Sequence, residues 1–275
     1  MKGRVLIVAG SDSGGGAGIQ ADIKAVTALG GFAMTAITAL TAQNTLEVRD
    51  VLPVPPDFVR LQMDVVLDDL GADAIKTGML FDADVIEAVA AVLKARCPTT
   101  PVVVDPVMVA ESGARLLAPT AIDALCQRLI PQATVITPNL PEAEVLLGAP
   151  IPDLAAARQA AAVLQERFKV AVLLKGGHLQ TKNVTDVLVT ADGHELLYTG
   201  TRLDSTSTHG TGCTLASAIA ARLAQGLALE DAVEHGREYL REAIRTAIPL
   251  GKGAGPVNHG HCCGPFELGA SRAGL

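Results

Sequence analysis

Short runs of apolar, often β-branched residues alternate along this chain with longer stretches in which apolar residues recur every three or four positions. A short apolar run is typical of a buried strand, and the longer spacing is typical of an amphipathic helix. The runs predict strands over residues 5–9, 34–39, 74–76, 102–105, 134–137, 170–175, 184–189 and 195–199. The spaced stretches predict helices over residues 17–29, 57–70, 83–95, 120–129, 142–147, 154–168, 211–225 and 229–247.

The order of these elements predicts the fold class. Strands that alternate with helices favour a mostly parallel sheet with helices on both faces, a three-layer α/β architecture. The last two strands flank residues 191–193, which we interpret as the turn of a hairpin at a small β edge. We find no internal repeat and no linker, so we expect one domain over residues 1–275, with residues 51–56 as a rigid connection inside it.

The segment from about residue 251 to the end is rich in Gly, His and Pro, and we expect an irregular tail there. Two histidines and two cysteines lie close together in it, and such a group can bind a metal. An irregular tail remains the favoured interpretation of this cluster, which consists of His259, His261, Cys262 and Cys263.

Composition narrows the classes of function. Hydrophobic residues make up 49% of the 275, enough for a large core, but aromatics are only 3%, so aliphatic side chains must fill it. A net charge of −7 argues against nucleic acid as a partner, and an anionic ligand would need local cations or a metal. No apolar stretch reaches the length of a membrane span or of a signal peptide. Five cysteines without a regular framework favour reduced thiols, so we expect a cytoplasmic protein.

The most informative stretch is residues 209–214, with the sequence HGTGCT, at the start of a predicted helix. Two glycines there let backbone N–H groups approach a ligand closely, and the helix dipole favours negative charge at the same point. The stretch therefore predicts an anion site that contains one ionisable thiol, Cys213. The alternative is a glycine turn that merely precedes an alanine-rich core helix.

A glycine-rich loop over residues 10–22 follows the first strand. It does not match the dinucleotide fingerprint, because Ile19 stands where the third glycine should be, and no Gly-Lys-Ser/Thr follows as in a P-loop. We interpret it as a close-approach loop of another kind. After the second strand, the amide of Gln43 could bind the edge of a heterocycle, although an exposed loop amide is the simpler interpretation.

Polar side chains also follow later strands, at the edge where ligands of parallel sheets bind. Asp105 and Glu142 could hold Mg²⁺ through their carboxylates, and Asn139 precedes Glu142 in the same motif, although each of the three could instead be a solvated loop residue or a helix cap. Lys175 stands beside two glycines and could contact phosphate oxygens, and a solvated lysine is the alternative.

These motifs, in this order, resemble the ribokinase-like superfamily and, more narrowly, the hydroxymethylpyrimidine/phosphomethylpyrimidine kinases of thiamin biosynthesis. The resemblance covers roughly residues 4–261. The anion-hole motif of this chain ends in Cys, where the wider superfamily usually has Asp. The matching segments are residues 9–22 (AGSDSGGGAGIQAD), 38–45 (TALTAQNT), 76–80 (KTGML), 104–108 (VDPVM), 137–143 (TPNLPEA), 174–178 (LKGGH), 208–214 (THGTGCT) and 251–257 (GKGAGPV).

The resemblance implies ATP-dependent phosphorylation of 4-amino-5-hydroxymethyl-2-methylpyrimidine, followed by a second transfer to the monophosphate. It also implies ATP and Mg²⁺ as cofactors, a monovalent cation as a further candidate, and a homodimer. The implied substrate contacts are Gln43, Met79, Val107, Gly10 and Asp22. The implied catalytic anion hole comprises Gly210, Thr211, Gly212 and Cys213, the phosphate contacts are Lys175, Asn139 and Thr211, and the Mg²⁺ ligands are Asp105 and Glu142.

The role of Cys213 stays open at this point. A helix N-terminus lowers the pKa of a thiol, so Cys213 is a candidate general base, but positioning alone could suffice for the transfer. Two other functions also remain: a kinase for pyridoxal or a related vitamin B6 alcohol, and a sensor that binds the pyrimidine without transferring phosphate. Gln43 and Met79 in their motifs favour the pyrimidine over pyridoxal.

Overall fold

The computed structural model describes residues 1–108, 117–118 and 120–264, and the strands in these ranges form one nine-stranded sheet. The strands are β1 (Arg4–Asp12), β2 (Phe32–Gln43), β3 (Val48–Pro53), β4 (Ala74–Thr77), β5 (Val102–Val104), β6 (Val135–Ile136), β7 (Ala171–Leu174), β8 (Asn183–Val189) and β9 (Glu195–Thr201). Their order is β3-β2-β1-β4-β5-β6-β7-β8-β9. Neighbours from β2 to β7 pair in parallel, whereas β3 at one edge and β8 and β9 at the other run antiparallel to their neighbours.

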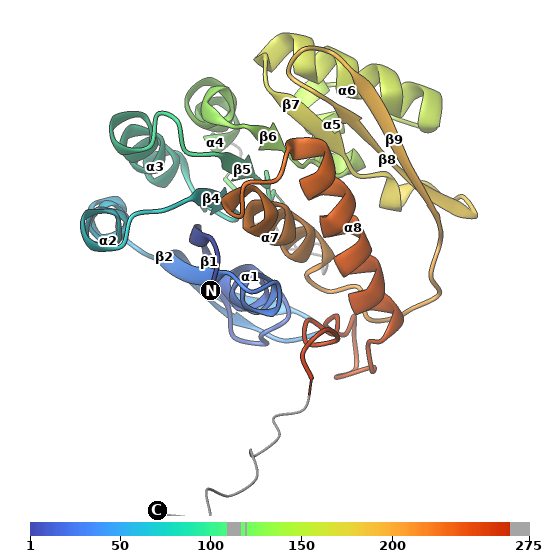
Figure 1. Ribbon diagram of the computed structural model, residues 1–275, viewed down its shortest axis with the longest axis horizontal. Coiled ribbons are helices and arrows are strands. Elements are labelled where there is room, and N and C mark those ends of the chain that lie inside the picture. Colours follow the sequence, from blue (N-terminus) through green and yellow to red (C-terminus); the bar gives the residue numbers. More distant parts are fainter. Residues whose placement is uncertain (109–116, 119, 265–275) are drawn as a thin grey trace, which may run out of the picture.

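Helices cover both faces of the sheet (Figure 1). One layer contains α1 (Gly18–Ala28), α7 (Thr211–Ala224) and α8 (Leu229–Arg245). The other contains α2 (Pro56–Asp69), α3 (Ala83–Arg96), α4 (Ala121–Ala124) with its π-helical continuation η1 (Leu125–Leu129), α5 (Leu140–Leu147) and α6 (Leu154–Phe168). Short 3-10 turns lie at η2 (Ile130–Gln132) and η3 (Gly176–His178). The predicted three-layer α/β class is confirmed.

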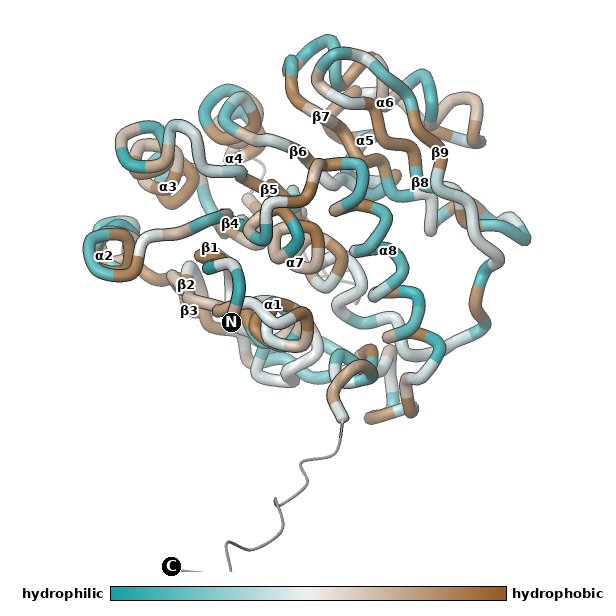
Figure 2. The backbone as a smooth tube through the Cα atoms, viewed as in Figure 1, coloured by the Kyte–Doolittle hydropathy of each residue, from teal (hydrophilic) through white to brown (hydrophobic). Residues whose placement is uncertain are grey.

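The central strands are apolar on both faces because helices bury both. In β1, Leu6 and Val8 pack into the cluster under α2 and α3, while Ile7 and Ala9 pack into the cluster under α1 and α7. Figure 2 shows the same arrangement as brown strands at the centre with teal on the outer helix faces. A doubly covered parallel sheet brings the carboxyl ends of β1, β2, β4, β5, β6 and β7 to one edge, where ligands of such folds bind.

One edge strand was not predicted from the sequence. Residues 51–56 were expected to form a rigid connection, but the first three of them belong to β3, where Leu52 lies opposite Leu40. An edge strand is half exposed and so lacks a continuous apolar run, and an edge also tolerates Pro53, which donates no ladder hydrogen bond. The connection assignment was therefore wrong for the start of this segment.

The segment after α8 has no helix or strand among its described residues, as expected, yet it is packed against the body. Val257 and His259 are buried, and the N–H of His209 donates to the carbonyl of Gly255 (3.0 Å). Within the described ranges, no group of three or more His, Cys, Asp or Glu residues could hold a metal ion, the tail cluster included. Residues 265–275 of the expected tail lie outside the described residues. Among the helices of the described residues, none is long and apolar enough to cross a lipid bilayer.

Candidate active site

A cavity of about 450 Å³ lies at the carboxyl ends of the parallel strands, beside the first turn of α7. The residues singled out from the sequence that line it are Gly10, Gln43, Met79, Asp105, Val107, Asn139, Glu142, Lys175, Gly210, Thr211, Gly212 and Cys213. Asp22, which was expected to contact the substrate, does not line the cavity and is fully buried behind its wall. The structure therefore brings the other predicted site residues together at one cavity and leaves Asp22 outside it.

The start of α7 requires glycine at its N-cap. Gly210 has a φ of 81°, in the left-handed region that glycine adopts without strain. A Cβ atom at this position would lie 1.9 Å from the carbonyl oxygen of Gly16 in the loop after β1. The close contact holds the helix start against the first loop of the chain.

The first-turn N–H groups of a helix have no partner within the helix, and the helix dipole makes them electropositive. The N–H of Thr211 already donates to the carbonyl of Thr208 (3.2 Å), so it was wrong to count it with the other anion-hole donors. The N–H of Thr214 donates to Gly210 (2.9 Å). The N–H groups of Gly212 and Cys213, both of which line the cavity, therefore remain as donors for the expected anion hole.

The thiol of Cys213 does not have the acidity expected from its place on the helix. Burial raises its pKa to about 11, and the positive charge of Lys76 lowers that pKa only in part. The prediction of a lowered pKa was wrong, because burial disfavours a thiolate by more than a helix end stabilises it. At neutral pH the thiol is protonated, so it is poorly suited to act as a general base.

An acid and a base from different strand ends meet in the cavity. Asp105 follows β5 and Lys175 follows β7, and Lys175 Nζ lies 3.0 Å from Asp105 Oδ1. The hydroxyl of Thr137, at the end of β6, donates to the same oxygen (3.0 Å). Burial lowers the pKa of Lys175, but the charges of Asp105 and Glu142 outweigh burial and raise it. Lys175 is therefore charged, and it provides the local cation that an anionic ligand needs.

Asn139 and Glu142 form a capping box at the start of α5. The N–H of Glu142 donates to Asn139 Oδ1 (2.9 Å), and the N–H of Asn139 donates to Glu142 Oε2 (2.8 Å). The helix-cap interpretation is thus correct for both residues, and both also line the cavity. Burial and the charge of Asp105 raise the pKa of Glu142 to about 7, although Lys175 opposes the shift.

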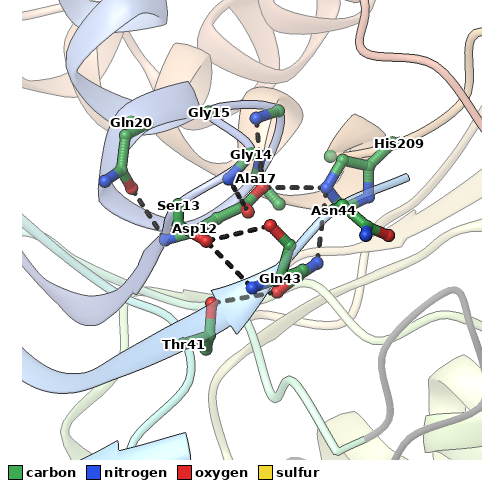
Figure 3. Close-up of polar contacts among 12 residues, drawn as sticks. Asp12, Ser13, Gly14, Gly15, Ala17, Gln20, Thr41, Gln43, Asn44 and His209 are labelled. Atoms are coloured by element: carbon green, nitrogen blue, oxygen red, sulfur yellow. Dashed lines mark hydrogen bonds and ion pairs between the residues drawn. The ribbon is translucent and has the colours of Figure 1, made fainter. Parts of the chain in front are cut away.

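The glycine-rich loop after β1 wraps around one of its own carboxylates (Figure 3). Asp12 accepts hydrogen bonds from the N–H groups of Gly14 (2.8 Å), Gly16 (3.0 Å) and Ala17 (2.8 Å), and its Oδ2 lies 2.9 Å from His209 Nε2. Burial raises the pKa of Asp12, but these hydrogen bonds outweigh burial and lower it. Sequence reasoning missed this anchor, although an Asp among the five glycines of residues 10–18 was a visible signal.

His209, which pairs with Asp12, also lies close to Gln43, the residue expected to contact a heterocycle. His209 Nε2 lies 3.5 Å from the amide nitrogen of Gln43, and the hydroxyl of Thr41 donates to Gln43 Oε1 (3.2 Å). Figure 3 shows these side chains around one point at the end of β2. The loops after β1, after β2 and before α7 are therefore connected at the rim of the cavity.

A buried ion pair lies behind the anion hole. Lys76 Nζ is 2.9 Å from both carboxylate oxygens of Asp22, the two side chains are fully buried, and the hydroxyl of Ser217 donates to Asp22 (2.6 Å). Burial lowers the pKa of Lys76, but Asp22, Cys213 and Asp105 outweigh burial and raise it. Lys76 lines the cavity, and sequence reasoning missed it even though a lysine within a short apolar strand indicates a buried charge.

Comparison with known proteins shows the family of this chain. A family model described as phosphomethylpyrimidine kinase matches residues 12–258. The thiamine biosynthesis bifunctional protein ThiED of Geobacter sulfurreducens is 51% identical over 259 residues, 94% of this chain, and the chain spans about half (52%) of that relative's length. The hydroxymethylpyrimidine/phosphomethylpyrimidine kinase of Haemophilus influenzae is 44% identical over 259 residues, which cover 93% of this chain and 96% of that protein.

Solved structures share the whole fold. The ADP complex of Bacillus subtilis pyridoxal kinase superposes with a TM-score of 0.87 at 36% identity and covers 94% of this chain and 98% of that one. The phosphomethylpyrimidine kinase of Clostridium difficile 630 gives a TM-score of 0.77 at 39% identity and covers 88% of this chain and 100% of that one. This chain therefore belongs to the phosphomethylpyrimidine kinase family.

Proposed function

We propose that the protein transfers a phosphoryl group from ATP to the hydroxymethyl group of 4-amino-5-hydroxymethyl-2-methylpyrimidine. A second transfer to the monophosphate then gives the diphosphate, in thiamin biosynthesis. One observation carries the proposal: a Cβ atom on Gly212 would lie 3.2 Å from Lys175 Nζ and 3.6 Å from Asp105 Oδ2. The anion hole, a cation and a carboxylate are thus all within reach of one phosphoryl group.

The substrate end of the cavity fits a small heterocycle. The amide of Gln43 offers a donor and an acceptor for the ring edge, and Met79 and Val107 offer apolar contact. A Cβ atom on Gly10 would lie 3.0 Å from Met79 Sδ, so the glycine lets Met79 sit close to β1. Asp22 is assigned no substrate contact, because it pairs with Lys76 behind the wall.

Phosphoryl transfer depends on positioning and charge stabilisation more than on covalent chemistry of the protein. In the proposed role, the N–H groups of Gly212 and Cys213 and the ammonium of Lys175 bind the negatively charged phosphoryl oxygens. Asn139 lines the same cavity and supplies a further polar contact for the phosphates. These donors are partly buried, which strengthens their interaction with the charge that develops in the transition state.

The residues near Lys175 also fit Mg²⁺. Asp105 and Glu142 offer carboxylate oxygens, and burial together with the charge of Asp105 raises the pKa of Glu142, so a divalent cation beside it would stabilise the ionised carboxylate. A site with only two protein carboxylates suits Mg²⁺, which keeps several waters and bridges to phosphates. When bound, Mg²⁺ neutralises charge on the transferring phosphoryl group. We therefore propose Asp105 and Glu142 as the residues that hold it.

No side chain of the anion hole is suited to remove the proton from the substrate hydroxyl early. The Cys213 thiol has a pKa of about 11 and stays protonated near neutral pH. A loose transition state leaves the proton on the attacking hydroxyl until late, when the forming phosphate ester makes it acidic and it passes to a phosphoryl oxygen or to water. In this proposal Cys213 holds the hydroxyl in position and accepts no proton from it.

Product analysis by mass spectrometry tests the main proposal. Incubation with ATP, Mg²⁺ and the pyrimidine alcohol is expected to give products with one and then two added phosphoryl groups. Lys175→Ala is expected to weaken ATP handling, and an unchanged KM for ATP together with an unchanged kcat would contradict its assignment. If no ADP forms at all, the protein would be a sensor with a kinase fold.

Pyridoxal kinase activity is the alternative enzyme function. The B. subtilis pyridoxal kinase superposes closely, but its 36% identity is below the 44% and 51% of the two curated relatives. We therefore expect a larger kcat/KM for the pyrimidine alcohol than for pyridoxal when both are measured on one preparation. A large preference for pyridoxal would replace the proposed substrate.

We further propose that two copies of the chain form a homodimer in a reducing cytoplasm, where its five unpaired cysteines fit. Large apolar side chains are exposed on α2 and on the neighbouring edge of the sheet, at Leu40, Leu52, Phe58, Leu61 and Val65. Such a group is typical of an association surface. Light scattering after gel filtration should give a dimer mass, and Leu61→Asp should give a monomer; an unchanged mass for the variant would exclude this surface.

A further inference from the structure

The carboxyl-terminal segment, residues 255–263, returns from α8 to the start of α7. The N–H of Asn258 donates to the carbonyl of Ala243 (2.9 Å), and the hydroxyl of Tyr239 donates to the carbonyl of His259 (2.7 Å). At its other end, Gly255 accepts from the N–H of His209 (3.0 Å), which directly precedes the anion hole. The segment is thus held on α8 and in turn contacts the residues that build the site.

His259 makes the contact that reaches furthest into the site. Its Nε2 lies 2.9 Å from the hydroxyl oxygen of Thr214, and both side chains are buried. The Thr214 hydroxyl also lies 2.8 Å from the carbonyl oxygen of Gly210, which can only accept. The single hydroxyl proton therefore goes to Gly210, and His259 donates its Nε2–H to Thr214.

The hydrogen bonds from His259 through Thr214 end at the peptide group that directly precedes the anion-hole donors. The carbonyl of Gly210 and the N–H of Thr211 belong to one planar peptide unit, so a bond that fixes the carbonyl also fixes the plane. The next N–H groups in the chain are those of Gly212 and Cys213. Since Gly210 also packs against Gly16, the unit is held from two sides.

We propose that His259 is a positioning residue for phosphoryl transfer, because it sets the orientation of the anion-hole peptides through Thr214 and Gly210. The assignment rests on the proposed function. It makes the carboxyl-terminal segment part of the active site, although no residue of that segment lines the cavity.

The environment keeps His259 in the form that this role requires. Burial, with Lys24 and His261 nearby, lowers the pKa of His259 to about 4. The ring is therefore neutral at neutral pH, with one N–H to donate. Tyr239 on α8, which donates to the carbonyl of His259, is also held in place. His261 Nε2 lies 3.1 Å from the carbonyl oxygen of Tyr239, and the rings of Tyr239 and His261 are 4.8 Å apart.

The test compares kcat and KM of wild type with those of His259→Leu, His259→Gln and Thr214→Val. ADP binding by calorimetry gives the fraction of competent sites in each preparation and corrects kcat for misfolded protein. His259→Leu and Thr214→Val should each lower the corrected kcat by about 10- to 100-fold, the scale for a second residue that orients a ligating one. KM for ATP and for the pyrimidine should stay near wild type. His235→Leu, at an exposed histidine of α8, is the matched control and should leave kcat unchanged.

Rescue and coupling separate positioning from general support of the fold. His259→Gln keeps an N–H donor and should retain most of the wild-type kcat. The double variant His259→Leu/Thr214→Val should be no slower than either single variant, because both break the same chain of bonds. A double variant whose loss of kcat equals the product of the two single losses would overturn the role of His259. A corrected kcat of Thr214→Val equal to that of wild type would also overturn it, even if His259→Leu fails to fold. A wild-type protein that makes no product would instead overturn the proposed function, and this role with it.

Discussion

Replacing Lys76 by Met should destabilise the protein strongly, because it leaves Asp22 as a buried charge without its partner. Lys76 Nζ donates to both oxygens of Asp22 at 2.9 Å, and neither side chain is exposed to solvent. Removing one partner of such a pair typically costs about 3–5 kcal/mol. With a urea m-value of about 3 kcal/mol/M, that loss lowers the midpoint of unfolding by about 1 to 1.7 M.

The loss should depend on pH in a defined direction. In wild type, burial raises the pKa of Asp22 while Lys76 and Ser217 oppose the shift, and the variant retains only Ser217. A carboxyl whose pKa is higher in the folded state stabilises the fold fully below its unfolded pKa, near 4, and loses that contribution as the pH rises through its folded pKa. Lys76→Met should therefore be closer to wild type at about pH 5 than at about pH 8.

Urea unfolding followed by circular dichroism at both pH values measures these effects. The double variant Lys76→Met/Asp22→Asn is the control, because it removes both charges and keeps an oxygen that accepts from Ser217. It should recover a large part of the lost stability. A midpoint for Lys76→Met close to that of wild type at about pH 8, or a double variant as unstable as the single one, would refute the reasoning.

Three further predictions concern the cavity. Gly210→Ala should lower kcat by about 100-fold or more in a steady-state assay, the scale of an anion-hole donor, because its Cβ would lie 1.9 Å from the Gly16 carbonyl; wild-type turnover would contradict this. Cys213→Ser should lower kcat by less than about tenfold, since a thiol with a pKa of about 11 is no base at neutral pH, and a loss of about 100-fold or more would restore that role. The pKa of Glu142 is raised to about 7, so this residue contributes fully to the stability of the fold below pH 4.5, and the contribution is lost as the pH rises through 7. In urea unfolding without Mg²⁺, Glu142→Gln should therefore remove the fall of the midpoint between these pH values. A pH profile of midpoints equal to that of wild type would contradict the raised pKa of Glu142.

The sequence predicted the parts of the fold that are buried on both sides. Residues 5–9 and 170–175 were recognised because a covered parallel strand carries an uninterrupted apolar run, as residues 5–9 of β1 and the whole of β7 do. β3 was missed because its side chains are mostly exposed, so it carries no period that local reasoning can detect. Its pairing with β2 is a tertiary contact, and only the completed sheet provides it.

The placement of polar side chains around the cavity was predictable where they follow strand ends and not where it depends on pairs of residues far apart in the sequence. Asp105 and Lys175 could be placed at one edge because parallel strands end together, whatever their separation along the chain. The Asp12–His209 pair joins residues 197 positions apart, and no local pattern specifies which carboxylate meets which imidazole. Asp22 was misassigned for the same reason: its partner, Lys76, is 54 positions away.

Cys213 shows why position on a helix is not enough to predict acidity. A helix N-terminus stabilises a nearby negative charge by about 0.3–1 kcal/mol, which is less than one pKa unit. Full burial can shift a pKa by about 3–5 units in the opposite direction for a thiol. Lys76 opposes burial here, but its charge is largely committed to Asp22, which itself raises the pKa of Cys213. The same helix start can therefore bind the charge of a phosphoryl group through Gly212 and Cys213 while leaving the thiol protonated, because the ligand brings its charge from outside and a thiolate would have to be created inside.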